Sequence, residues 1–171
     1  MVQLGWISFW ADVCSEMAYP ILPLFLTGVL HAPASAIGAI EGLAEATVSF
    51  MKGWSGRHSD KVGKRVPYVQ WGYGISSIAK PMIGLAFGWP LVLVARVLDR
   101  IGKGVRTTAR DAMIADSVEP EQYGKAFGFH RALDTAGAFA GVGVALCLLW
   151  LMPGNYRFIL LAAIVPGILA V

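Results

Sequence analysis

Long apolar runs, joined by connectors of only a few residues, dominate this sequence and limit the folds open to it. The runs cover approximately residues 4–30, 35–54, 66–87, 91–115, 126–152 and 157–171. A helix that crosses a membrane needs about 20 predominantly apolar residues, and all but the last run are long enough. At about 1.5 Å per residue, the last run reaches only ~22 Å. The pattern predicts an all-α membrane protein of about six transmembrane helices, with the sixth incomplete.

The composition agrees with an apolar environment. Hydrophobic residues make up 56% of the chain and charged residues 15%, whereas soluble domains average about 25% charged residues. The net charge of +3 is small, and the basic residues lie at the ends of apolar runs rather than on one polar face. Proteins that bind nucleic acid show such a basic face, so we expect no nucleic-acid partner.

No constellation of residues indicates an enzyme. The three histidines are dispersed, and no nucleophile–base pair, metal-ligand spacing or phosphate-binding loop is visible. Cys14 and Cys147 both lie inside apolar runs without metal-ligand spacing, so we expect two buried thiols rather than a disulfide. We therefore predict a protein without catalytic activity, cofactor or metal.

The distribution of Lys and Arg predicts the orientation in the membrane. The basic stretch, defined here as residues 56–65, carries Arg57, Lys61, Lys64 and Arg65, and the connector after run four carries Lys125 next to the basic end of that run. The connectors after runs one, three and five carry almost none. Because cytoplasmic loops are enriched in Lys and Arg, the alternation predicts that the basic stretch and the N-terminus are cytoplasmic.

The basic stretch, Gly56-Arg57-His58-Ser59-Asp60-Lys61-Val62-Gly63-Lys64-Arg65, follows the pattern G-x-x-x-D-[RK]-x-G-[RK]-[RK]. In this register it resembles the loop between helices two and three of the major facilitator superfamily. Arg96 falls at the place of that family's fourth-helix arginine, and Asp116 with Gly124-Lys125 is similar to the end of that helix and the start of the next. Val142 replaces a proline typical of the antiporter members.

The resemblance covers the whole chain, residues 1–171, as the N-terminal half of a twelve-helix transporter. It implies a secondary transporter in a prokaryotic inner (cytoplasmic) membrane that moves a small polar or charged solute by alternating access, with proton coupling as one option. Such a half needs a second half, either a C-terminal segment or a second copy in a parallel homodimer. A non-transport membrane receptor, or a regulatory or structural module, is the alternative.

The resemblance also assigns a conformational latch to the basic stretch. Asp60 would cap the N-terminus of a helix in the other half, where a carboxylate is favourable. Lys61 and Arg65 would form a charge network with Asp116. The alternative is a loop that only sets topology and binds anionic lipid. The residues assigned to the latch are Gly56, Asp60, Lys61, Gly63, Lys64, Arg65 and Asp116.

Charged residues inside the apolar runs are candidates for the transported solute or for protons, because such residues are costly and usually mark an ion or solute path. Asp12 and Glu16 lie four residues apart, on one helical face. The resemblance places them opposite Arg96, Asp99 and Arg100. They could bind substrate or protons, or they could form structural ion pairs with the arginines of run four.

Glu41 and Glu45 repeat this spacing in the second run, and either coupling or interhelical pairing, with Lys80 or Arg131, could explain them. His130 and Asp134 could relay protons or form a satisfied structural pair. The complete set of candidates for substrate binding or proton coupling is Asp12, Glu16, Glu41, Glu45, Arg96, Asp99, Arg100, His130 and Asp134.

Run four is the most highly charged of the runs. After Arg96 it carries Asp99, Arg100, Lys103, Arg106 and Arg110. Each central charge would oppose insertion by about 2.5–3.5 kcal/mol. We therefore expect this run to be shielded by other helices, to face water, or to extend past the bilayer at its far end. Its basic stripe, Arg100, Lys103, Arg106 and Arg110, could hold an anionic substrate, or it could pack on the acidic helices and reach cytoplasmic water, which we favour for Arg106 and Arg110.

Glycines and prolines inside the runs predict how the helices bend and pack. Gly38 with Gly42, Gly84 with Gly88, and Gly137 with Gly141 form small-xxx-small pairs that let another helix approach closely. Pro20 and Pro23 should kink the first run, because each removes a backbone donor from the helix.

Overall fold

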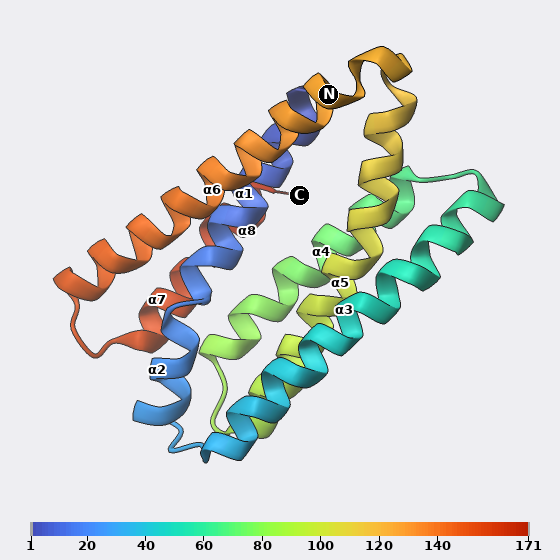
Figure 1. The fold of residues 1–171 in the computed structure, drawn as a ribbon. Helices are drawn as coiled ribbons and strands as arrows, with labels where there is room; N and C mark the ends of the chain where they lie inside the picture. Colours follow the sequence, from blue (N-terminus) through green and yellow to red (C-terminus); the bar gives the residue numbers. More distant parts are fainter. Residues whose placement is uncertain (1, 171) are drawn as a thin grey trace.

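The computed structural model describes residues 2–170, and this part of the chain is all-helical without a strand. Its helices are α1 (Val2–Ala18), α2 (Ile21–Gly28), α3 (Ala34–Val62), α4 (Val66–Gly84), α5 (Trp89–Asp116), a 3-10 turn (Pro120–Gln122), α6 (Tyr123–Leu151), α7 (Tyr156–Ala162) and α8 (Ile164–Leu169). The long helices lie side by side in an elongated bundle (Figure 1). The predicted all-α architecture is confirmed.

The first and last predicted runs are each divided into two helices. α1 ends at Ala18 and α2 begins at Ile21, with Pro20 between them. Proline has no N–H to donate and its ring crowds the preceding turn, which explains the break. Pro23 lies in the first turn of α2, where proline is tolerated. α7 and α8 meet at Ala163, so the last run is also bent.

α3 is longer than the apolar run from which it was predicted. It ends at Val62, so residues 56–62 of the basic stretch are helical and only residues 63–65 form the turn. Gly63 has a φ of +67° and its N–H donates to the carbonyl of Ser59. Glycine adopts this left-handed cap without steric cost. The interpretation of residues 56–62 as part of the loop between two helices is therefore wrong, because polar residues continue the helix as readily as apolar ones.

Glycines lie where α5 crosses its neighbours. The closest helix pairs are α4 with α5, α1 with α6, and α3 with α5. A Cβ on Gly72 of α4 would lie 2.7 Å from the carbonyl oxygen of Gly102 on α5. A Cβ on Gly104 of α5 would lie 2.5 Å from the Cβ of Met51 on α3. The backbones approach closely because these positions lack side chains.

The predicted glycine pairs differ in whether another helix packs closely against them. On α6, a Cβ on Gly137 or Gly141 would lie 2.5 Å from a backbone oxygen of α1, so this predicted contact is confirmed. A Cβ on Gly84 would lie 3.0 Å from Leu161 of α7. Gly38 and Gly42 of α3 have no such neighbour within 4 Å in the described part of the chain. Helical spacing identified the face of α3 but not whether a helix covers it.

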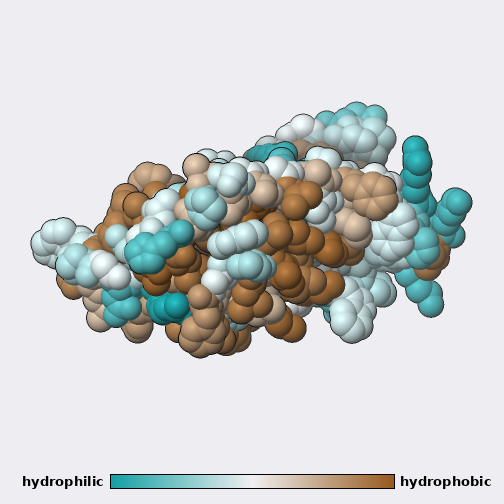
Figure 2. Space-filling model, turned by 90° about the horizontal axis from the view of Figure 1, so that it is seen from below, coloured by the Kyte–Doolittle hydropathy of each residue, from teal (hydrophilic) through white to brown (hydrophobic). Residues whose placement is uncertain are grey.

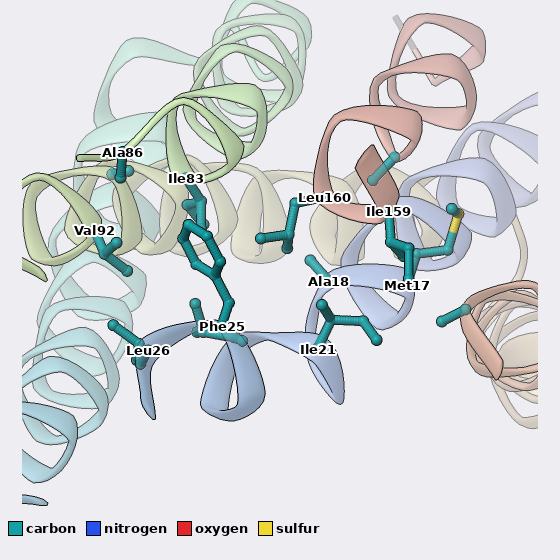
Figure 3. Packing of buried hydrophobic residues seen from close by; sticks show 14 of the residues in the cluster. Met17, Ala18, Ile21, Phe25, Leu26, Ile83, Ala86, Val92, Ile159 and Leu160 are labelled. Carbon is teal, nitrogen blue, oxygen red and sulfur yellow. The ribbon is translucent and has the colours of Figure 1, made fainter. Parts of the chain in front are cut away.

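An apolar core joins α2, α4, α5 and α7 at the end of the bundle away from the N-terminus. Figure 3 shows the ring of Phe25 directed from α2 toward Ile83 of α4. Leu26, Val92 and Leu160 belong to the same cluster, and all five side chains are 2% exposed or less. Burying one such side chain contributes about 1.5–3 kcal/mol. This core fixes the bent first run against the rest of the bundle.

The outer surface is also strongly apolar. Figure 2 shows hydrophobic residues across the middle of one face, with hydrophilic residues gathered toward its ends. The large exposed side chains include Phe50, Trp71, Ile78, Phe87, Phe139 and Trp150. Monomeric soluble proteins rarely expose extensive apolar patches. One of the two cysteines departs from expectation, because Cys14 is buried whereas Cys147 on α6 is exposed.

By length and apolar composition alone, one helical segment between residues 2 and 170 qualifies as a membrane span, Pro120–Leu151. The segment Tyr156–Leu169 is apolar but shorter. The six crossings and the cytoplasmic N-terminus therefore stay predictions that rest on the sequence pattern.

The contrast between Gly141 and Gly143 on α6 provides a test of the packing. Gly141→Ala places a methyl group against the backbone of Val13, and we expect a loss of stability of about 1–3 kcal/mol from overpacking. Gly143 has open space within 4 Å, so Gly143→Ala should be neutral or stabilising by about 0.5–1 kcal/mol. Thermal unfolding in detergent measures both; equal stability of the two variants would contradict the close α1–α6 contact.

Candidate functional site

A polar cavity of about 200 Å³ lies between α1, α3, α4 and α5. Its walls are Ser15, Glu16, Ala18, Tyr19, Glu45, Lys80, Ile83, Arg96, Asp99, Arg100 and Lys103. A larger groove of about 490 Å³ lies on the outside of α3 and contains Trp54, Arg57 and Lys61. All of its lining residues come from α3, so no second element encloses a ligand there. The polar cavity, enclosed by four helices, is therefore the candidate site.

A buried carboxylate, Asp99, joins α4 to α5 at one wall of the cavity. The Nζ of Lys80 lies 3.6 Å from its Oδ1, and Ser76 donates a hydrogen bond to the same oxygen. Nη1 of Arg96 lies 3.8 Å from Oδ2. Lys80 and Asp99 are each 4% exposed. A buried charge without partners would be strongly destabilising, so these contacts allow charged residues to occupy the interior of an apolar bundle.

Arg96 also joins α5 to α3. Its Nη2 donates to both carboxylate oxygens of Glu41, at 2.9 and 3.0 Å. Its guanidinium carbon lies 5.9 Å from the centre of the Tyr19 ring, within the range of a cation–π contact.

The structure corrects the expected ion-pair partners. Arg96 was expected to pair with Asp12 or Glu16, and Glu41 with Lys80 or Arg131, but Arg96 and Glu41 pair with each other. The reason lies in the packing: α3 is in close contact with α5, whereas α1 packs mainly on α6. Lys80 does pair across helices, but its partner is Asp99 of α5.

Polar residues of α1 and α5 face each other along what we call the polar seam. Its members are Ser8, Asp12 and Glu16 of α1, Tyr19 directly after α1, and Arg96, Arg100, Lys103, Arg106 and Arg110 of α5. The α1 members recur at helical spacing on one face, and the two helices run in opposite directions (Figure 1). Arg110 donates to the Ser8 hydroxyl at 2.8 Å. The basic side chains of Lys103, Arg106 and Arg110 lie close enough to Asp12 to interact electrostatically with its carboxylate.

The end of the polar seam near the N-terminus is a second cluster of buried charges. Nη2 of Arg110 lies 3.0 Å from Oδ1 of Asp111, and its Nη1 lies 3.8 Å from Oδ2 of Asp134. The predicted neighbours His130 and Asp134 approach each other to 3.6 Å between Nε2 and Oδ1. Neither of these two atoms has a hydrogen-bond partner within residues 2–170.

Arg106 is more deeply buried than predicted. It is 2% exposed, and its guanidinium carbon lies 4.3 Å from the centre of the Tyr73 ring. Arg110 is 7% exposed. The expectation that Arg106 and Arg110 reach water is therefore wrong, because an aromatic ring and carboxylates from neighbouring helices surround them.

The basic stretch forms a smaller ionic cluster at the α3–α4 turn. Arg65 pairs with Asp116 at the end of α5, and its Nη2 lies 3.4 Å from Oδ1 of Asp60. Both acidic side chains are more than 60% exposed, and exposed pairs contribute at most about 1 kcal/mol. Lys61 and Lys64 are exposed and form no ion pair within the described range.

The cavity brings together part of the predicted set. Its lining includes Glu16, Glu45, Arg96, Asp99 and Arg100. Glu41 forms an ion pair with one of these lining residues, Arg96. Asp12, His130 and Asp134 do not line it. No group of three or more His, Cys, Asp or Glu residues within 2–170 could hold a metal ion.

Sequence reasoning missed several functional groups. Tyr19 lines the cavity, Ser76 donates a hydrogen bond to Asp99, and Ser8 accepts one from Arg110. Lys103 also lines the cavity, but it belongs to the basic residues already identified in run four. Helical spacing carries a signal for all three: Tyr19 follows Glu16 by three residues, Ser76 precedes Lys80 by four, and Ser8 precedes Asp12 by four. The spacing marks the helical face of Ser8 but not its partner Arg110, which is far away in the sequence.

Comparison with known proteins agrees with this architecture. Residues 4–171 match the family described as Major Facilitator Superfamily. An uncharacterized MFS-type transporter of Methanocaldococcus jannaschii is 41% identical over 166 residues, which is 97% of this chain and 41% of that protein. The quinolone resistance protein NorA of Staphylococcus aureus is 23% identical over 75% of this chain and 32% of its own length. The chain thus spans less than half the length of these relatives.

Substituting Asp99 should lower the free energy of unfolding more than substituting its buried partner Lys80. Asp99→Asn leaves Lys80 with Ser76 alone, and we expect a loss of about 3–5 kcal/mol. Lys80→Met should cost less, because Asp99 retains Ser76 and Arg96. Unfolding measurements in detergent should give this order, with the exposed Lys52→Met as a control within about 0.5 kcal/mol of the wild type.

The double variant Lys80→Met/Asp99→Leu distinguishes destabilisation by an unpaired buried charge from destabilisation by altered packing. It should recover much of the stability that Asp99→Asn loses, because neither position 80 nor position 99 then holds an unpaired charge. A double variant less stable than Asp99→Asn would contradict the assignment of this pair.

Proposed function

The chain belongs to the Major Facilitator Superfamily, and from this premise we propose that it forms one wall of the solute pathway of a secondary transporter. The observation that carries the proposal is the polar cavity, which gathers charged residues from four helices inside an apolar bundle. Charged residues within membrane bundles are costly and are retained where ions or polar solutes pass. The transported solute would be small and polar or charged.

Alternating access would require a second wall. It would come from a further segment or from a second copy of the chain, related by an axis along the membrane normal. The uncovered face of α3 supports this role. Gly38 and Gly42 have open space within 4 Å, and Leu43 and Phe50 on the same helix are exposed. This face could receive a helix of the second wall without a steric clash.

Two clusters could couple solute movement to protons and to conformational change. Asp12, with the neighbouring His130 and Asp134, would bind the proton at the N-terminal end of the polar seam, where Arg106 and Arg110 balance the carboxylates. The Arg65–Asp116–Asp60 cluster would act as the latch, because it ties the ends of α3 and α5 to the start of α4. Exposed, weak ion pairs are suited to repeated opening.

Uptake into proteoliposomes tests the transport proposal. The transport-competent assembly that contains this chain is reconstituted and supplied with a panel of radiolabelled amino acids, organic acids, inorganic phosphate and alkylamines. We expect at least one solute to accumulate above protein-free vesicles when a proton gradient is imposed. Absence of uptake for the entire panel would contradict the proposal.

Uptake by single-residue variants then tests which residues take part in transport. Glu16→Gln and Asp12→Asn should each reduce uptake at least tenfold, and Arg65→Gln should reduce it by releasing the latch. Glu121→Gln and Lys52→Gln are matched controls, because both residues are exposed, lie outside the polar cavity and do not belong to the latch. Unchanged uptake in both acid variants would remove Asp12 and Glu16 from the pathway.

A further inference from the structure

Four charged residues of the polar cavity have no ionic partner. Lys80 with Asp99, and Arg96 with Glu41, satisfy each other. The remaining members are Glu16, Glu45, Arg100 and Lys103, and none of these side chains makes an ion pair or hydrogen bond within residues 2–170. The cavity therefore holds two acids and two bases that are available to a ligand.

Of the four residues, Arg100 most clearly indicates the charge of the ligand. It is 9% exposed, and its Nε has no hydrogen-bond partner among the described residues. A buried guanidinium without an anion is unfavourable, and its planar group of donors matches carboxylate, phosphate or sulfonate oxygens. Lys103 lies three residues further along α5, on the same face and in the same cavity. Together they form a site for one anionic group.

The two acids stand on other walls of the cavity. Glu16 belongs to α1 and is half-buried, and Glu45 belongs to α3 and is exposed at the rim. A purely anionic solute would meet Arg100 and Lys103 but would face two uncompensated carboxylates. A purely cationic solute would leave Arg100 buried without an anion.

We infer that the solute is a small zwitterion whose anionic group binds Arg100 and Lys103 and whose cationic group binds Glu16 and Glu45. This inference rests on the proposed function. A zwitterion leaves the charge of the cavity unchanged and compensates all four side chains at once. The cavity volume of about 200 Å³ is below the ~300–1,000 Å³ of pockets for drug-sized ligands, which fits a solute of amino-acid size.

Binding and uptake are measured separately on the complete transport-competent assembly. The zwitterionic probes are alanine, glycine betaine, taurine and phosphoethanolamine, which distinguish carboxylate, sulfonate and phosphate groups. Lactate and inorganic phosphate are the anionic probes, and ethylamine and choline are the cationic ones. Ligand-induced shifts in thermal unfolding report binding, and proteoliposome uptake reports transport.

We expect at least one zwitterion to raise the unfolding temperature, with at least tenfold weaker binding for the anionic and cationic probes. Binding of anions alone, of cations alone, or of none of the probes would overturn the inference. Zwitterion binding without uptake would support the inference and contradict the proposed transport function, so the two can fail independently.

Variants locate the two charges of the ligand. Arg100→Gln and Glu16→Gln should each weaken zwitterion binding at least tenfold, and Arg100→Lys should give an intermediate loss because it retains the charge without the planar donors. Lys103→Gln is the second variant of the anionic site, should Arg100→Gln fail to fold. Arg131→Gln, an exposed charge loss on α6, should change binding by less than twofold. Equal binding by Lys103→Gln and Arg131→Gln would overturn the anionic site.

Discussion

The buried carboxylate of Asp99 is the interaction on which the interior of this bundle depends. Lys80, Ser76 and Arg96 surround it, and this arrangement lets α5 carry a row of charges through apolar surroundings. The ion pair requires a close α4–α5 approach, which Gly72 and Gly102 permit. Arg96 then extends the network to Glu41 of α3. Three helices are thus joined by charge as well as by packing, and they form most of the cavity wall.

α1 is attached in a different way. Its backbone packs against Gly137 and Gly141 of α6, whereas it meets α5 through the polar seam. Within the cavity, the side chains of Glu16 on α1 and of Arg100 and Lys103 on α5 form no ion pair with any residue between 2 and 170. Close packing on one side and unpaired charges on the other are what a solute pathway requires, because the pathway walls must hold their shape while their polar groups stay available.

The sequence predicted the helical architecture better than it predicted which charged residues form ion pairs. Helical spacing correctly placed the α1 acids on one face and Gly137 with Gly141 against another helix. It could not identify Glu41 as the partner of Arg96, because periodicity defines a face of one helix but not the neighbour that the face meets. The extension of α3 to Val62 was missed for a related reason: charged residues ended the apolar run but not the helix, which ends at Gly63.

Thiol accessibility in native membranes tests most directly whether the polar cavity belongs to a water-filled pathway. Cys14 and Cys147 are first replaced by alanine, and a single cysteine is then introduced at one of two positions. Ser15 lines the cavity, whereas Phe139 is 84% exposed on the apolar surface of α6. A charged, water-soluble thiol reagent should label Ser15→Cys at least tenfold faster than Phe139→Cys, because the reactive thiolate forms only in contact with water. Equal labelling at both positions, or faster labelling at Phe139→Cys, would contradict the account.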